Sequence, residues 1–178
     1  MVKIYSQFSI FENGYLRVLR VFFIEPATIH FIKEISRKIK LAPPSVRNYI
    51  KLFLRSGLII KKSAKPFNGL IANRDNDDFI FYKRVYNLYS LKDLTNFLIS
   101  TYHPKSIVLF GSYSLGEDIE TSDIDIFILT KIEKEINLGG FETKLKRNIN
   151  LLIVDSLDKV DKNLKKKIFN GIVLHGGF

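Results

Sequence analysis

The chain has 178 residues, 46% of them apolar, which is enough for one large domain or two small ones with their own cores. It has no cysteine, which excludes disulfides, thiolate zinc sites and a cysteine nucleophile. No stretch approaches the roughly 18 apolar residues of a membrane span, and the first residues lack the apolar core of a signal peptide. We therefore expect a cytoplasmic protein with no membrane partner.

The net charge of +10 is unevenly distributed along the chain. Residues 1–104 hold 17 Lys and Arg against 7 Asp and Glu, whereas residues 105–178 hold 11 of each. Within the first part, residues 33–65 carry 10 basic residues and one acidic residue, Glu34. This asymmetry favours a polyanion, most simply nucleic acid, as the partner of the first half. The alternative is a solvated, lysine-rich surface.

Apolar periodicity predicts three helices early in the chain, over residues 14–25, over residues 29–39, and from residue 43 up to Gly57. Pro26 ends the first helix, and Thr28 is a suitable N-cap for the second. Pro43 and Pro44 suit the first turn of the third helix, where backbone N–H groups have no helical partner. Gly57 is a suitable C-cap for that helix.

The third helix is amphipathic, and its outward faces carry Ser45, Arg47, Asn48, Lys51 and Arg55. A basic, strand-like run at residues 58–62 follows, and the run at 79–82 is predicted to pair with it as a long hairpin. Three short helices followed by a strand resemble a winged helix-turn-helix. The resemblance implies that Arg47, Asn48 and Lys51 meet base edges or phosphates in the major groove of double-stranded DNA, and that Ser45 and Arg55 meet the phosphate backbone. The alternatives are a three-helix packing domain and a winged helix used for protein contacts.

The rest of the chain alternates between helix and strand patterns. A connecting helix is predicted over residues 84–100, then strands over 107–110, 123–129, 149–154 and 172–174, with helices over 141–147 and 157–169. The prediction is an α+β protein with two domains, residues 1–82 and residues 83–178.

Residues 106–130, SIVLFGSYSLGEDIETSDIDIFILT, contain the most informative pattern. Gly111 and Ser112 end one apolar strand, and Asp123 and Asp125 open the next. On an extended strand these two carboxylates project from one face, about 7 Å apart, where they can hold Mg²⁺. The Gly-Ser turn offers backbone N–H groups and a hydroxyl to the phosphate tail of a nucleotide. The alternative is an acidic strand start whose carboxylates are merely solvated.

The Gly-Ser turn, the ten-residue spacing and the Asp-x-Asp strand resemble the signature of polymerase-β-type minimal nucleotidyltransferases, over roughly the last 75 residues. The resemblance implies a small mixed sheet, Mg²⁺ and a nucleoside triphosphate. It assigns Asp123 and Asp125 as catalytic metal ligands and Gly111 and Ser112 as nucleotide-binding residues. In that family a third carboxylate on the next strand completes the metal site, and here Asn150 takes its position.

The presence of Asn150 in place of a carboxylate leaves two functional hypotheses open for the domain. An amide oxygen ligates Mg²⁺ weakly and cannot act as a base, so the domain is either a slow transferase or a binding module without chemistry. Glu142 is a candidate substitute for the missing carboxylate, whereas Asp155 would face away on a straight strand.

The whole arrangement resembles archaeal fusions of a winged helix to a minimal nucleotidyltransferase, some relatives of which are antitoxins that modify a partner toxin. Three hypotheses follow: a DNA-binding nucleotidyltransferase, a transcription regulator with an inactive domain, and an antitoxin whose winged helix binds protein. A homodimer would suit a two-fold DNA site.

Overall fold

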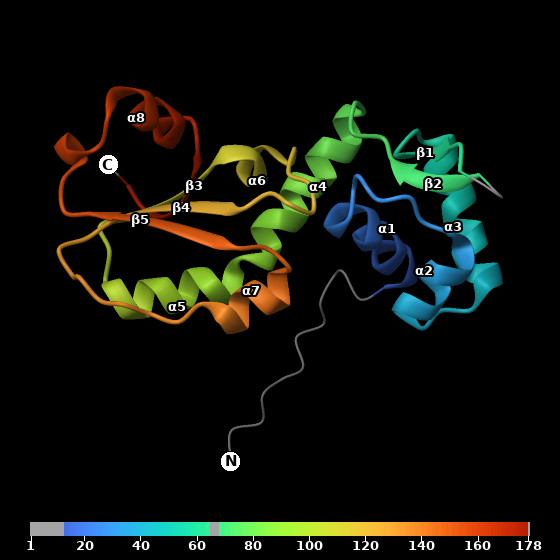
Figure 1. The fold of residues 1–178 in the computed structure, drawn as a ribbon, viewed down its shortest axis with the longest axis horizontal. Coiled ribbons are helices and arrows are strands. Elements are labelled where there is room, and N and C mark those ends of the chain that lie inside the picture. Colours follow the sequence, from blue (N-terminus) through green and yellow to red (C-terminus); the bar gives the residue numbers. More distant parts are fainter. Residues whose placement is uncertain (1–12, 65–67, 178) are drawn as a thin grey trace, which may run out of the picture. The chain divides into compact units, whose positions relative to one another are not determined.

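The computed structural model describes residues 13–64 and 68–177, which form helices and strands in alternation (Figure 1). The chain consists of two compact units, Met1–Phe79 and Ile80–Phe178, and the division between them lies within helix α4 (Asp77–Ser90). The boundary predicted from the sequence, after residue 82, lies in the same helix. The expected α+β class with a small mixed sheet is confirmed. Within the described residues, no helix is long and apolar enough to cross a membrane.

The described residues of the N-terminal unit form three helices and a two-stranded hairpin. They are α1 (Gly14–Ile24), α2 (Ile32–Ile39), α3 (Pro43–Arg55), β1 (Ile59–Lys62) and β2 (Gly69–Ala72). The two strands are antiparallel, and His30 adds a third backbone segment by exchanging hydrogen bonds of 2.7 and 2.9 Å with Leu70. The core is formed by apolar side chains of all three helices, among them Phe22, Ile35, Val46, Ile50 and Phe53. Burial of these side chains stabilises the three-helix arrangement.

The prediction that α2 begins at residue 29 after a Thr28 cap is wrong. The helix begins at Ile32, because the backbone of His30 is extended and pairs with Leu70 forty residues later. The local signal for the true start is Glu34, whose carboxylate accepts a hydrogen bond of 3.3 Å from the Phe31 N–H.

The prediction that residues 79–82 form the second strand of the hairpin is also wrong. This stretch lies in α4, and the partner of β1 is β2, which lies between the two runs predicted to pair. A short apolar run is compatible with either a strand or a helix, and the residues before it decide. The Asn76 side chain accepts a hydrogen bond of 2.8 Å from the Phe79 N–H, and Asp77 and Asp78 occupy the first turn.

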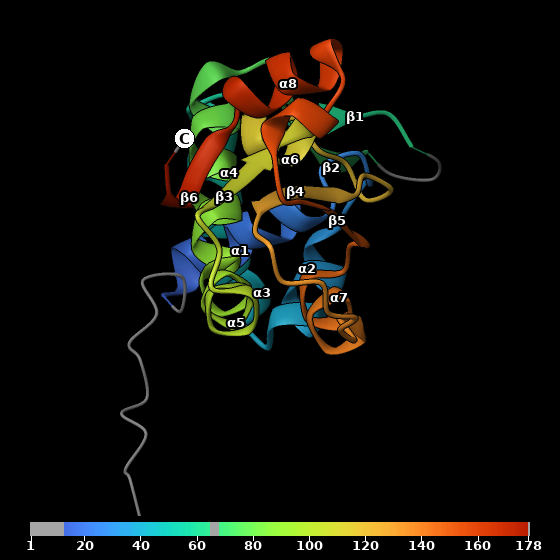
Figure 2. The same cartoon turned by 90° about the vertical axis from the view of Figure 1, so that its left-hand side faces the viewer.

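The C-terminal unit is a four-stranded mixed sheet covered by helices on both faces. After α4 its elements are α5 (Lys92–Tyr102), β3 (Ser106–Phe110), α6 (Gly111–Leu115), β4 (Ile124–Leu129), α7 (Gly139–Leu145), β5 (Ile149–Val154), α8 (Lys162–Phe169) and β6 (Ile172–Gly176). The strand order is β5-β4-β3-β6, with β4 parallel to β5 and the other neighbours antiparallel. Helices α5 and α7 lie on one face and α8 on the other (Figures 1 and 2).

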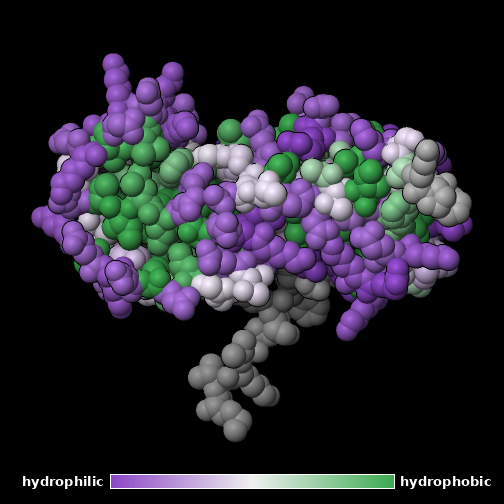
Figure 3. Space-filling model, in the orientation of Figure 1, coloured by the Kyte–Doolittle hydropathy of each residue, from purple (hydrophilic) through white to green (hydrophobic). Residues whose placement is uncertain are grey.

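Alternate side chains of the central strands point into two separate cores. Ile107 and Leu109 of β3 pack with α5, whereas Val108 and Phe110 pack toward α8. Burial on both faces explains the continuous apolar runs of β3 and β4 in the sequence. Strand β5 lies at the edge of the sheet with half-buried apolar side chains, and an apolar area covers this part of the surface (Figure 3).

Three predicted helices of this unit have different limits in the structure. The predicted helix 84–100 is interrupted, because α4 ends at Ser90 and α5 begins at Lys92. The helix predicted at 141–147 begins two residues earlier, as α7. The stretch 157–169 is a short 3-10 turn followed by α8, because the Asp161 side chain accepts hydrogen bonds from the N–H groups of Asn163 and Leu164 and so starts a new helix.

Candidate active site

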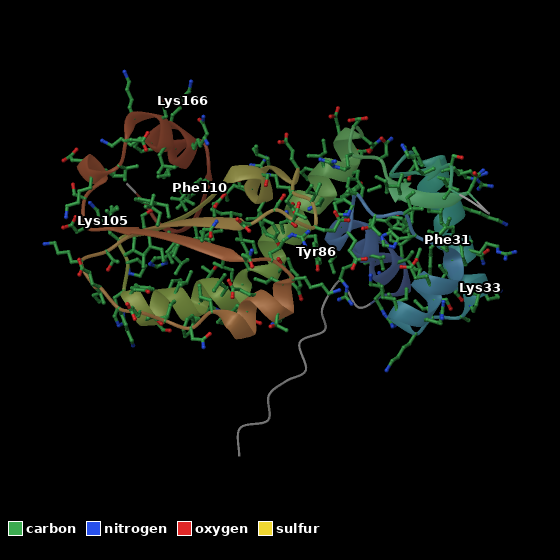
Figure 4. All side chains as sticks on the ribbon, in the orientation of Figure 1. Phe31, Lys33, Tyr86, Lys105, Phe110 and Lys166 are labelled. Carbon is green, nitrogen blue, oxygen red and sulfur yellow. The ribbon has the colours of Figure 1, made fainter. Side chains whose placement is uncertain are left out.

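Three neighbouring strands bring the residues of the Gly-Ser and Asp-x-Asp motifs together. Phe110, the last residue of β3, is paired with Asp125 of β4, and Asp125 is paired with Asn150 of β5 (Phe110 is labelled in Figure 4). Gly111 follows Phe110 directly, so the Gly-Ser turn flanks β4 on one side and Asn150 flanks it on the other. Residues far apart in the sequence therefore meet at one end of the sheet.

Asp123 and Asp125 lie on one face, as the strand geometry predicts. The Asn150 side-chain nitrogen is 3.2 Å from Asp123 Oδ2 and 3.2 Å from Asp125 Oδ1. The Asn148 side-chain nitrogen is 3.2 Å from the other oxygen of Asp123. Both carboxylates are half-buried, so they stay accessible to a ligand. Two carboxylates and two amides thus converge on one small region.

Gly111 lies directly beside the carboxylate of Asp125. Its φ of +73° favours glycine, and a Cβ added there would lie 2.6 Å from Asp125 Oδ2. The residue was predicted to end the strand before it and to belong to a nucleotide-binding turn. The structure shows that it opens the short helix α6 directly beside the Asp125 carboxylate.

The segment between α6 and β4, residues 116–123, positions Asp123 in the site. It folds back on itself through Ser122, whose hydroxyl accepts a hydrogen bond of 2.9 Å from the Ile119 N–H and whose N–H donates to the Ile119 carbonyl at 3.0 Å. Directly after Asp123, the Ile124 N–H donates to the Asn148 carbonyl at 2.9 Å. Asp123 is therefore fixed at the junction of a closed turn and a strand.

The comparisons with known proteins relate the C-terminal part of the chain to one family. Residues 91–175 match the nucleotidyltransferase domain family. The match begins just before α5 and ends in β6, so it includes β3, β4, β5, most of β6 and every residue of the two motifs. No curated protein matches the chain. The predicted nucleotidyltransferase domain is thereby supported, whereas its fusion to a winged helix stays a prediction.

In the described part of the domain that residues 91–175 match, no third carboxylate joins Asp123 and Asp125 in a metal-binding group. Among the described residues, no group of three or more His, Asp or Glu side chains comes together in a way that could hold a metal ion. Glu142 accepts a hydrogen bond of 3.0 Å from the Ile149 N–H, and Asp155 accepts one of 2.8 Å from Lys159. Glu142, the candidate substitute, and Asp155, which was expected to face away, therefore both have structural partners of their own. The oxygens of Asp123 and Asp125 still fit Mg²⁺, which prefers hard ligands and completes its shell with phosphate and water.

A polar cavity of about 240 Å³ borders the domain's Asp123 on the side of α7 and β5. It is lined by Glu120, Thr121, Ser122, Asp123, Glu142, Lys146, Arg147 and Asn148. Only Asp123 and Glu142 of this set were singled out from the sequence. The others follow no local pattern, because they come from three segments that only the sheet topology brings together. The cavity offers carboxylates, hydroxyls and cations but no apolar side chain.

The predicted DNA-contacting residues all belong to α3. Arg47, Asn48, Lys51 and Arg55 are exposed, and Ser45 is half-buried. The opposite side of the helix carries Val46, Ile50 and Phe53, all of which are buried in the N-terminal unit. The helix therefore presents the predicted polar set to solvent. Their role in DNA binding stays a prediction.

Proposed function

We propose that the nucleotidyltransferase domain binds a Mg²⁺–nucleoside triphosphate and transfers its nucleotidyl group to a hydroxyl acceptor. The observation that carries the proposal is that the Asn150 amide nitrogen lies 3.2 Å from a carboxylate oxygen of Asp123 and 3.2 Å from one of Asp125. Gly111 lies beside this group, and its lack of a side chain leaves room for the Asp125 carboxylate. A polar, half-buried site of this kind suits phosphate and metal better than an apolar ligand.

The residues have distinct roles in this proposal. Ser112 and the backbone N–H groups at the start of α6 hold the triphosphate on the β3 side of the carboxylates. Bound Mg²⁺ would be held by Asp123 and Asp125 and would neutralise charge on the phosphates. The acceptor hydroxyl approaches from the cavity on the β5 side and attacks the α-phosphorus, and pyrophosphate leaves. Asn150 takes no proton, so the hydroxyl proton passes to solvent and turnover is slow.

A second candidate function is favoured by Asn150 itself. Its amide bridges the two carboxylates without adding the negative charge that a second metal ion requires. The domain would then bind Mg²⁺–nucleotide as a signal and perform no transfer. Together with the N-terminal unit, it would act as a nucleotide-responsive transcription regulator.

For the N-terminal unit we propose a winged helix that binds double-stranded DNA. The order of three helices and an antiparallel hairpin, with the His30–Leu70 pair as an additional short bridge, supports the assignment. The exposed Arg47, Asn48, Lys51 and Arg55 on α3 support its use on DNA. The excess positive charge of the first 104 residues supplies the attraction to phosphate.

The decisive experiment is a calorimetric titration of Mg²⁺–ATP, and of each other nucleoside triphosphate, into the wild type and into Asp123→Ala/Asp125→Ala. We expect binding by the wild type that is lost in the double variant. Asp93→Asn/Asp155→Asn removes two exposed carboxylates elsewhere in the same unit and should bind like the wild type. Absence of binding by the wild type would overturn the proposed nucleotide site. Binding without transfer of a labelled nucleotide to any acceptor would favour the second candidate.

A further inference from the structure

A buried polar network lies next to the candidate active site. It includes none of the residues proposed to bind the metal or the nucleotide. At its centre is Asp118, whose side chain is 1% exposed. Its carboxylate forms an ion pair with Lys83 and accepts hydrogen bonds of 2.7 Å from Asn87 and 3.3 Å from Arg147. Lys83 and Asn87 belong to α4, whereas Arg147 lies two residues before β5.

The same face of α4 also forms hydrogen bonds with α6. The Asn87 side chain donates a second hydrogen bond, of 2.9 Å, to the Tyr113 carbonyl. One turn further along, the Ser90 hydroxyl is 2.9 Å from the Tyr113 hydroxyl. Lys83, Asn87 and Ser90 are spaced by four and three residues, so they form one stripe along the helix. Tyr113 follows Ser112 directly, so this stripe fixes the helical turn that carries the proposed phosphate-binding hydroxyl.

Gly116 brings the following segment against the α4 backbone. A Cβ added to this glycine would lie 2.6 Å from the Ile80 carbonyl oxygen and 3.1 Å from the Arg84 nitrogen. Its φ of +76° also favours glycine. The chain therefore leaves α6 in direct contact with α4, and two residues later Asp118 enters the network.

Burying this many charged groups is a poor way to gain stability. Each buried charge loses its hydration, and a buried ion pair is often no better than apolar side chains of similar volume. What such a network provides is a fixed geometry, provided that its members are satisfied. Here the network contacts α6, segment 116–123 and the residue pair preceding β5, which carry Ser112, Asp123 and Asn148 respectively.

We propose that Lys83, Asn87, Ser90 and Asp118, which we call the α4 clamp, position the nucleotide site. The clamp holds α6 and segment 116–123 in one arrangement, so that Ser112 and Asp123 face the same phosphate tail. Its members touch no substrate and act only through the segments they hold. The functional part of this inference rests on the proposed nucleotide binding, whereas the ordering of the two segments can be measured without any nucleotide.

The test compares Asn87→Ala with a control of similar kind. Asn87→Ala removes the hydrogen bonds to Asp118 and to the Tyr113 carbonyl while leaving the charged groups paired. Tyr102→Phe also removes a side-chain hydrogen bond in the same unit, the part-buried one from the Tyr102 hydroxyl to the Lys134 carbonyl, which lies outside the clamp. Both variants are studied at a temperature at which urea curves show each fully folded, so that global stability does not enter the comparison.

Two readouts are then taken on each variant. For Mg²⁺–nucleotide binding we expect Asn87→Ala to weaken the affinity at least tenfold, and Tyr102→Phe to stay within twofold of the wild type. For amide hydrogen exchange without nucleotide we expect faster exchange in residues 111–122 of Asn87→Ala and unchanged exchange there in Tyr102→Phe. If folded Asn87→Ala had the same amide exchange rates and the same nucleotide affinity as the wild type, the inference would be overturned.

The outcomes separate this inference from the proposed function. If the wild type binds no nucleotide, the proposed function fails, and hydrogen exchange alone decides whether the clamp orders the two segments. If Asn87→Ala does not fold, Ser90→Ala replaces it, since that variant loses only the contact with the Tyr113 hydroxyl and one local bond to the Asn87 carbonyl. The smaller variant should give a smaller change in the same direction, and no change in either readout would overturn the inference.

Discussion

Gly111 and Asp125 lie so close together that no other residue fits at the first position, since a Cβ there would be 2.6 Å from Asp125 Oδ2. The contact links the Gly-Ser turn to the Asp-x-Asp strand, two motifs separated by ten residues in the sequence. Neither motif can move far without displacing the other. The phosphate-binding and metal-binding parts of the proposed site are therefore one structural unit.

Gly111→Ala should damage both stability and ligand binding. The substitution adds left-handed strain, of about 1–2 kcal/mol, and pushes the Asp125 carboxylate out of place. We expect a lower free energy of unfolding in urea and at least tenfold weaker Mg²⁺–nucleotide binding. Gly140→Ala is the matched control, because a Cβ added in α7 meets nothing within 4 Å. Equal behaviour of the two variants would contradict the role given to Gly111.

Asn150→Asp should create a strong Mg²⁺ site. It replaces an amide that bridges two carboxylates with a third carboxylate at the same place. Without metal the three negative charges repel, so we expect a lower Tm than that of the wild type. Added Mg²⁺ should raise the Tm of the variant by more than that of the wild type, because binding to the folded state stabilises it.

The control for this change is Asn137→Asp, which adds the same charge at an exposed position and keeps the acceptor for the Gly139 N–H. Its Tm should respond to Mg²⁺ like that of the wild type. An Asn150→Asp variant with the same small response would show that the three side chains do not form a metal site.

The sequence predicted the sheet core of the site better than its surroundings. The apolar runs of β3, β4 and β5 and the Gly-Ser and Asp-x-Asp motifs are local patterns. The family resemblance that these patterns carry placed Asn150 beside the carboxylates, and Asn150 is paired with Asp125. The start of α2 was misplaced, because the His30 backbone pairs with Leu70, which lies beyond two helices and a strand in the sequence. The α4 clamp was missed for the same reason, since Lys83 and Asp118 are 35 residues apart and follow no periodicity.

The error at residues 79–82 has a different physical origin. The run Phe79-Ile80-Phe81-Tyr82 is rich in residues with high β propensity, and tertiary context overrode that propensity. The Asn76 cap was readable in the sequence as an Asn followed by two acidic residues, a typical helix start. Capping residues therefore carried more information here than side-chain propensity did.

Lys51→Glu/Arg55→Glu should weaken binding to duplex DNA and flatten its salt dependence. Each phosphate contact contributes about 0.9 to the slope of log K against log salt concentration, so losing two should reduce the slope by about 2. The measurement is fluorescence anisotropy of a labelled random-sequence duplex between low and moderate salt. Lys166→Glu/Lys167→Glu makes the same charge change on exposed lysines of α8 and serves as the control. Equal losses in both variants would assign the effect to net charge and not to α3.

The contribution of Lys83 to the free energy of unfolding should rise as the pH rises above 8. Burial lowers the pKa of this ammonium group from 10.5 to about 8, against the opposing effects of Asp118 and, more weakly, Glu120. Arg147 adds to the lowering, and the Tyr113 ring lies 5.9 Å from the ammonium nitrogen. In the unfolded chain the pKa is 10.5, so between pH 8 and pH 10.5 the unfolded state binds a proton that the folded state does not. The contribution of Lys83 to stability therefore rises with pH across this window and is constant below it.

The measurement is the free energy of unfolding of the wild type and of Lys83→Met in urea at pH 7, 8, 9 and 10. The wild-type value minus the variant value should increase from pH 8 to pH 10, by a few kcal/mol at most. Lys159 is the control, because its exposed ion pair with Asp155 raises its pKa and leaves nothing to gain in this window. For Lys159→Met the same difference should stay flat up to pH 10. Parallel curves for the wild type and Lys83→Met would show that Lys83 stays charged throughout, and that Asp118 holds it more strongly than burial opposes it.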